Sequence, residues 1–280
     1  MCIRDRIERI FGVLLIIILG FLGIDKLLSY YKLGRLGRLV GTAFFLSNSY
    51  LILLIDGGQL ALAIGYSIVP LAFYSYKSFI EKSDLRSMLY FAISVLGISS
   101  IDLRVVVLLS FLIFISILFD LLWQKKVSSF WRLLKKNILL GLFSGIILIL
   151  FNSFWILPII FSKTTEFIPI NYADISQIDF LSFSNISNGI FFQQPHWYKN
   201  NFGEISNIKV DFLLIPLLIM LTPILVKRDK RVGFWLVVAV IFIFLSKGTQ
   251  DPFSQINTWL YENIPIFVGS LNKTKIGIFS

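Results

Sequence analysis

Long apolar stretches separated by short polar segments run along most of the chain. A helix needs about 20 mostly apolar residues to cross a bilayer, and eight stretches approach or reach that length. They are Ile10–Leu28, Leu36–Ile55, Leu60–Phe79, Leu85–Ser100, Leu103–Trp123, Ile138–Phe161, Phe212–Val226 and Val232–Leu245. The pattern predicts an all-α fold, a polytopic transmembrane helical bundle of about 8 spans.

Two short segments refine this picture. Ile101 and Asp102 alone separate the fourth stretch from the fifth, which predicts a tight helical hairpin or, alternatively, a bent helix. Apolar residues recur at helical spacing between Ser254 and Ile264, so we expect a short amphipathic helix on a membrane surface. The expected parts are six spans in 7–161, a long loop in 162–211, two spans in 212–245 and a surface segment in 246–280.

The basic residues alternate between the loops. Loops 25–38, 77–86, 124–136 and 227–231 hold 16 of the 26 Lys and Arg residues, and the loops between them hold 7. Basic residues concentrate in cytoplasmic loops. We therefore predict a multi-pass protein of the cytoplasmic membrane, in contact with lipid, whose loop 162–211 and last segment are extracytoplasmic.

Composition agrees with this class. The 280 residues are 56% hydrophobic and only 15% charged, with a mean hydropathy of +0.82, whereas soluble domains carry about 25% charged residues. This excludes a soluble enzyme, a disordered protein and a disulfide-stapled secreted domain. The net charge of +10 is explained by the loop pattern, so we expect no nucleic-acid partner.

The first six residues, Met1-Cys2-Ile3-Arg4-Asp5-Arg6, resemble the translation of a transposon mosaic-end adapter used in sequencing libraries. We expect residues 1–6 to be an adapter artefact and the native chain to be a piece of a longer reading frame. Cys2 is the single cysteine, so the rest of the chain then has no thiol chemistry.

Candidate substrate-binding residues lie in the predicted outer segments. The turn Asp56-Gly57-Gly58-Gln59 supplies Asp56 and Gln59, and its glycines permit close approach of a ligand. The next outer turn supplies Asp102 and Arg104, which also suit a turn-capping pair. The last segment supplies Lys247 and Asp251.

The long loop holds a dense aromatic and amide stretch around His196 and Trp197. Aromatic rings pack on the apolar faces of sugars while amides bond their hydroxyls, but Trp and Tyr also form belts at membrane surfaces. His196 is the single histidine, and a structural hydrogen bond is the alternative to a functional role. No zinc, P-loop or dinucleotide motif occurs, so the residues predict no metal site.

Several stretches together resemble GT-C-type polytopic membrane glycosyltransferases, especially arabinofuranosyltransferase-like proteins. They are Phe44-Phe45-Leu46-Ser47-Asn48-Ser49-Tyr50, Gly57-Gly58-Gln59 followed by Pro70-Leu71, Asn152-Ser153-Phe154-Trp155-Ile156-Leu157-Pro158, Pro195-His196-Trp197, and Lys247-Gly248-Thr249-Gln250-Asp251-Pro252-Phe253 leading to Trp259-Leu260-Tyr261-Glu262-Asn263-Ile264-Pro265. The stretch after Pro265 matches only in part.

The resemblance implies transfer of a sugar from a polyprenyl-phosphate donor to an extracytoplasmic glycan or lipid acceptor, with a divalent metal as an open question. The family's acidic catalytic loop would lie upstream of these residues, so no catalytic residue is assigned. Arg104 and Lys247 are candidates to meet the donor phosphate. A lipid-linked saccharide flippase or transporter and a non-catalytic protein of envelope assembly are the alternatives.

We expect the full reading frame, recovered by long-read sequencing of the source DNA, to continue upstream of Ile7 through further spans. One outer loop in that region should carry Asp or Glu, because the transferase needs an acidic group there. A native start near Ile7, or an upstream loop without an acid, would favour the flippase or the non-catalytic protein instead.

Overall fold

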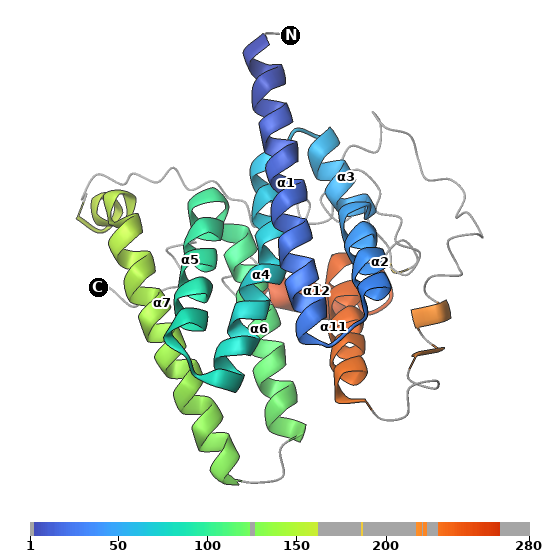
Figure 1. Ribbon diagram of the computed structural model, residues 1–280, viewed down its shortest axis with the longest axis vertical. Coiled ribbons are helices and arrows are strands. Elements are labelled where there is room, and N and C mark those ends of the chain that lie inside the picture. Colours follow the sequence, from blue (N-terminus) through green and yellow to red (C-terminus); the bar gives the residue numbers. More distant parts are fainter. Residues whose placement is uncertain are drawn as a thin grey trace. The chain divides into compact units, whose positions relative to one another are not determined.

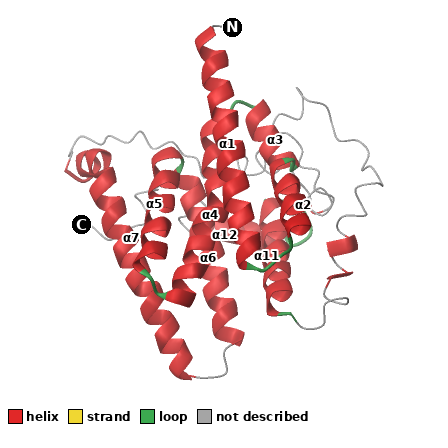
Figure 2. Ribbon diagram, in the orientation of Figure 1, coloured by secondary structure: helices red, strands yellow, loops and turns green. Residues whose placement is uncertain are grey.

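In the computed structural model of the chain, residues 3–123, 127–161, 186, 217–219, 221–222 and 229–263 are described. The described residues form helices and turns, without a strand among them (Figure 2). This confirms the predicted all-α class. The chain divides into two compact units, Met1–Lys163 and Thr164–Ser280.

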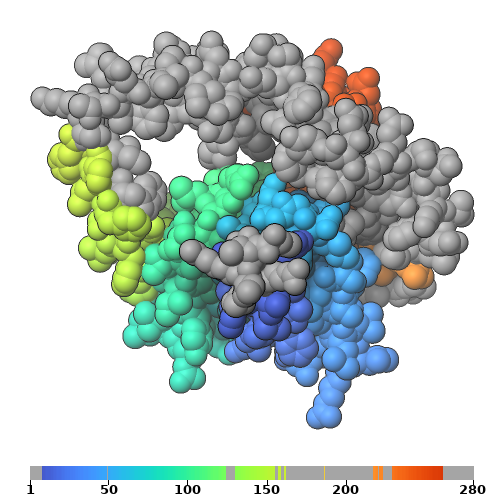
Figure 3. Space-filling view, turned by 90° about the horizontal axis from the view of Figure 1, so that it is seen from above, coloured from blue at the N-terminus to red at the C-terminus, as the bar shows by residue number. Residues whose placement is uncertain are grey.

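The described residues of the first unit form seven helices, of which α4 to α7 run alternately up and down (Figure 1). They are α1 (Ile3–Tyr30), α2 (Arg35–Leu46), α3 (Ser49–Asp56), α4 (Leu60–Lys82), α5 (Leu85–Ile101), α6 (Leu103–Trp123) and α7 (Val127–Phe161). Seen end-on, α2 and α3 lie on one side of α1, and α5 and α7 lie on the other side (Figure 3). Helix α5 packs against α4, α6 and α7.

Three described helices are long and apolar enough to cross a membrane: Glu8–Tyr30 of α1, Leu103–Trp123 (α6) and Phe130–Phe154 of α7. A fourth is added if α2 and α3 form one bent span. Only 17 to 28% of the residues in their most apolar windows are buried, and apolar surface on that scale suits lipid rather than water. The helices support a membrane protein, while the count of about 8 spans is not confirmed.

Helix α4 explains part of the difference in count. Its sequence contains three serines and three tyrosines besides its apolar residues, so it is less apolar than the three candidate spans. The same helix is the most enclosed of the unit, with Phe73 and Tyr76 almost fully buried between its neighbours. A helix surrounded by protein does not need the uniformly apolar surface that a lipid-facing helix needs.

The second predicted span, Leu36–Ile55, is two helices, α2 and α3, bent by 44°. Ser47 closes α2 through its backbone N–H and hydroxyl, both donated to the Ala43 carbonyl. The Asn48 side chain then accepts the Leu51 N–H at 2.9 Å and caps α3. The predicted stretch is therefore interrupted by a bend, because Asn48 offers the backbone a partner outside the helix.

The hairpin alternative for the fourth and fifth stretches is confirmed, because α5 and α6 are separate helices with Asp102 extended between them. In the second unit, α11 (Lys230–Ser246) covers Val232–Leu245, and α12 (Ser254–Asn263) is a short helix in the segment where one was predicted. Most of Phe212–Val226, and the long loop 162–211 apart from residue 186, lie outside the described residues.

The C-terminal ends of α1, α4 and α6 define one end of the first unit, which we call the basic end. There the Lys77 ammonium of α4 lies 3.0 Å from the Asp120 carboxylate of α6. Among the described residues, Lys77 therefore neutralises Asp120. Lys136 of α7 donates to the Ile80 carbonyl at 2.6 Å, so three helices are joined at this end.

Helices α1 and α4 approach closely at Gly23. A Cβ added there would lie 3.0 Å from the backbone nitrogen of Leu71 and 3.3 Å from the Pro70 Cβ. Small residues let membrane helices pack backbone to backbone. Gly23 therefore sets the distance between the two helices.

We expect Gly23→Val to lower the apparent melting temperature of the purified protein in detergent, because the added side chain forces α1 away from α4. Overpacking of this kind costs about 1–3 kcal/mol. Gly141→Val is the matched control, since nothing lies within 4 Å of a Cβ at Gly141. Thermal unfolding is measured by circular dichroism. Equal melting temperatures for the two variants would contradict the close α1–α4 contact.

Candidate functional site

The end of the first unit away from the basic end holds the predicted pair Asp102 and Arg104. Asp102 ends α5, and Arg104 lies in the first turn of α6. The guanidinium donates to both carboxylate oxygens, with Nε 3.0 Å from Oδ1 and Nη2 2.6 Å from Oδ2. The Arg104 N–H also donates to Oδ1 at 2.9 Å. A bidentate pair fixes the plane of the guanidinium.

The two partners differ in exposure. The Arg104 side chain is 74% exposed and the Asp102 side chain 10%. The hydrogen bond from Arg104 lowers the pKa of Asp102 from its ordinary value, against the opposing effect of burial. Asp102 is therefore a charged support at neutral pH, and Arg104 presents its remaining donors outward.

Aromatic side chains lie beside this pair. Tyr50 of α3 interacts electrostatically with both Asp102 and Arg104. Its ring meets the Tyr66 ring edge-on at 5.4 Å, and Tyr66 stacks on Phe45 at 5.2 Å. The break between α2 and α3 positions Tyr50, because Asn48 caps α3 and also donates to the Phe45 carbonyl. We call Tyr50, Tyr66, Asp102 and Arg104 the outer cluster.

The predicted turn at Asp56 and Gln59 lies at the same end, between α3 and α4. Gly58 has φ +73°, which a residue with a side chain rarely adopts, and Gln59 N–H donates to the Leu54 carbonyl at 2.8 Å. Asp56 is exposed and Gln59 is half-buried. Within the described residues, no hydrogen bond or ion pair joins this turn to Asp102 or Arg104.

Sequence reasoning missed Tyr50 and Tyr66 as members of the outer cluster, although Tyr50 is the last residue of the Phe44–Tyr50 motif that also contains Asn48.

Sequence reasoning also assigned no role to Asn152. Asn152 of α7 is buried, and its amide donates to the Leu148 carbonyl at 3.0 Å and reaches the Ser99 hydroxyl of α5 at 3.4 Å. A buried Asn in an otherwise apolar helix was the available signal, since such groups need a partner.

In the second unit, Lys247 follows α11 and is fully buried. Its ammonium donates to the Gln250 carbonyl at 2.6 Å and lies 4.9 Å from the centre of the Phe244 ring. Burial lowers the pKa of Lys247, opposed by the Asp251 charge. Buried Asn257 of α12 donates to the carbonyls of Phe244 and Gly248 and holds the turn onto α12.

The remaining candidates differ in what can be said. Asp251 is exposed. His196 and Trp197 lie outside the described residues. Within 3–123, 127–161 and 229–263, no group of three or more His, Cys, Asp or Glu side chains is arranged to hold a metal ion. The roles predicted for Lys247, Asp251, His196 and Trp197 stay predictions.

No family model, no curated protein and no solved structure matches this chain.

We expect Lys247 to react with an amine-directed acylating reagent at least tenfold more slowly than exposed Lys135. A tenfold difference corresponds to a local opening that costs about 1.4 kcal/mol. The lowered pKa of Lys247 leaves more reactive neutral amine, so slow labelling would report enclosure rather than protonation. The measurement is peptide mass spectrometry of the intact protein labelled in detergent.

Asn257→Ala should speed the labelling of Lys247 and leave that of Lys135 unchanged, because the turn loses its anchor on α12. Equal rates for the two lysines in the unaltered protein would contradict the buried position of Lys247.

Proposed function

We propose that the chain is part of a membrane glycosyltransferase that moves a sugar from a polyprenyl-phosphate donor to a glycan or lipid acceptor outside the cytoplasmic membrane. The observation that supports this most is the outward-facing guanidinium of Arg104, oriented by Asp102 at a helix end and flanked by tyrosines. The resemblance of the sequence motifs to GT-C-type enzymes supplies the reaction class.

The outer cluster has the chemistry that such a donor needs. A guanidinium binds phosphate through parallel N–H donors, and prior orientation lowers the entropy lost on binding. Arg104 lies at the first turn of a candidate membrane span, at the depth where a lipid-linked phosphate would lie. Asp102 balances the charge of Arg104 when the site is empty.

The tyrosines suit the sugar. The Tyr50 side chain is partly exposed, and its ring is held by Tyr66, so a sugar face can pack on it. The acidic group that activates the acceptor hydroxyl belongs to the upstream loop that the resemblance implies. The described residues accordingly account for donor binding rather than for the chemical step.

We expect Arg104→Ala to weaken binding of a short-chain polyprenyl phosphate to the purified protein by about tenfold, the value of one charge-assisted contact. Arg104→Lys should recover only part of the loss, because an ammonium lacks the bidentate geometry. Isothermal titration calorimetry in detergent measures both. Arg132→Ala is the matched control, since Arg132 is exposed on α7 toward the basic end.

Equal affinity in the Arg104→Ala and Arg132→Ala proteins would contradict the proposed donor site. In a second test, the protein encoded by the full reading frame should remove the sugar from a polyprenyl-phosphate-linked donor in membrane vesicles. Movement of that donor across the bilayer with its sugar intact would favour the flippase alternative.

A further inference from the structure

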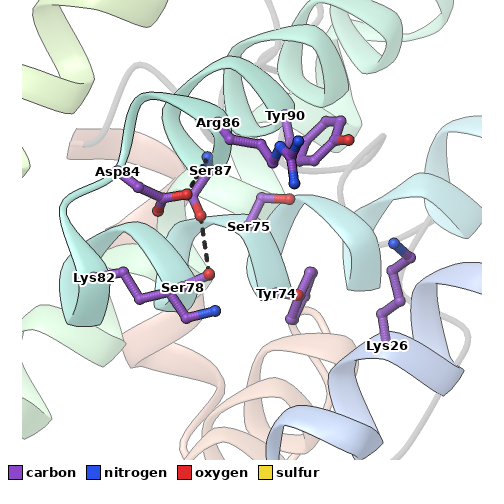
Figure 4. A pocket seen from close by; sticks show the side chains of 9 residues that line it. All are labelled: Lys26, Tyr74, Ser75, Ser78, Lys82, Asp84, Arg86, Ser87 and Tyr90. Atoms are coloured by element: carbon purple, nitrogen blue, oxygen red, sulfur yellow. Dashed lines mark hydrogen bonds between the residues drawn. The ribbon is translucent and has the colours of Figure 1, made fainter.

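We infer that a second binding site, at the basic end of the first unit, holds the phosphate of an anionic phospholipid from the leaflet on that side. The site is a pocket of about 280 Å³ between α1, α4 and α5 (Figure 4). This inference does not depend on the proposed transferase activity, because the outer cluster lies at the other end of the same helices.

The three cations of the pocket come from three helices. Lys26 belongs to α1, Lys82 to α4 and Arg86 to α5, and all three are exposed. Figure 4 shows Arg86 and Lys82 on opposite sides of the pocket and Lys26 on the wall formed by α1. Long basic side chains near helix ends reach toward lipid headgroups, and a pocket between helices adds a defined position for one phosphate.

Among the described residues, one carboxylate lines the pocket with these three cations. It belongs to Asp84, whose charge interacts with that of Lys82 and which also accepts the Ser87 N–H as the cap of α5. The other acidic side chains at the basic end have partners outside the pocket: Asp25 lies 3.4 Å from Arg38, Asp120 pairs with Lys77, and Glu81 accepts a hydrogen bond from Tyr30. The pocket is left with an excess of positive charge, which favours an anion.

Hydroxyl groups form the floor of the pocket. Ser75, Ser78 and Ser87 are buried, and the Ser78 and Ser87 hydroxyls lie 2.9 Å apart (Figure 4). Hydroxyls both donate and accept, so they can reorient toward phosphate oxygens. The volume is near the lower limit of about 300 Å³ for ligand pockets, which suits a compact headgroup.

The surface next to the pocket points to a lipid rather than to a free anion. Arg86, Leu89, Tyr90 and Ile93 share one exposed face of α5 at helical spacing. Leu89 is 40% and Ile93 60% exposed, so an acyl chain can lie along them while the headgroup enters beside Tyr90. A soluble phosphate ion has no apolar part that could pack on this face.

The test uses the full chain in nanodiscs, with phosphatidylglycerol compared against phosphatidylcholine as the probe lipid in native mass spectrometry. We expect phosphatidylglycerol to be retained about tenfold more tightly. The double variant Lys82→Gln/Arg86→Gln should abolish this preference. Arg132→Gln/Lys135→Gln is the matched control, because it removes the same charge from exposed positions of α7 near the same end.

Lys26→Gln, which lies on a different helix, should reduce the preference for phosphatidylglycerol in part. This variant keeps the test decisive if the double variant fails to fold. No preference for phosphatidylglycerol in the unaltered protein, or equal loss in both double variants, would overturn the site. Displacement of the lipid by millimolar inorganic phosphate would overturn its assignment to a lipid headgroup.

Discussion

Helix α4 carries polar side chains and is enclosed by the other helices of the first unit, and the rest of the unit depends on this enclosure. Its serines are buried, and the Ser67 hydroxyl donates to the Ala63 carbonyl at 2.9 Å. Enclosure requires α1 to approach within backbone distance, which Gly23 permits. The remaining helices can then expose apolar surfaces, because α4 has taken the interior position.

The same arrangement separates two kinds of charge. At the basic end, cations exceed the available carboxylates, whereas in the outer cluster Arg104 is matched by Asp102. The first situation suits attraction of an anionic surface, and the second suits a directed contact with one phosphate. The positions of the helix ends therefore place two sites that differ in charge balance on one helical unit.

Sequence reasoning predicted the helices well and their function as spans less well. The boundaries of α6 agree with the prediction because Leu103–Trp123 is predominantly apolar and is preceded by Asp102. The α2–α3 break was missed because a capping Asn competes with the helix only when the local backbone turns. The electrostatic interaction of Tyr50 with Asp102 depends on packing between helices distant in sequence, which no periodicity contains. By contrast, Asp102 and Arg104 are two residues apart, so their pairing was visible as a turn-capping alternative.

The length of α7 has a mechanical consequence. Its 35 residues rise about 52 Å, whereas the hydrocarbon layer is about 30 Å thick. The helix must tilt, extend into the headgroup layer, or do both. Because Asn152 lies in α7, bilayer thickness would set the depth at which Asn152 meets Ser99. In a thinner membrane, α7 would tilt further from the bilayer normal.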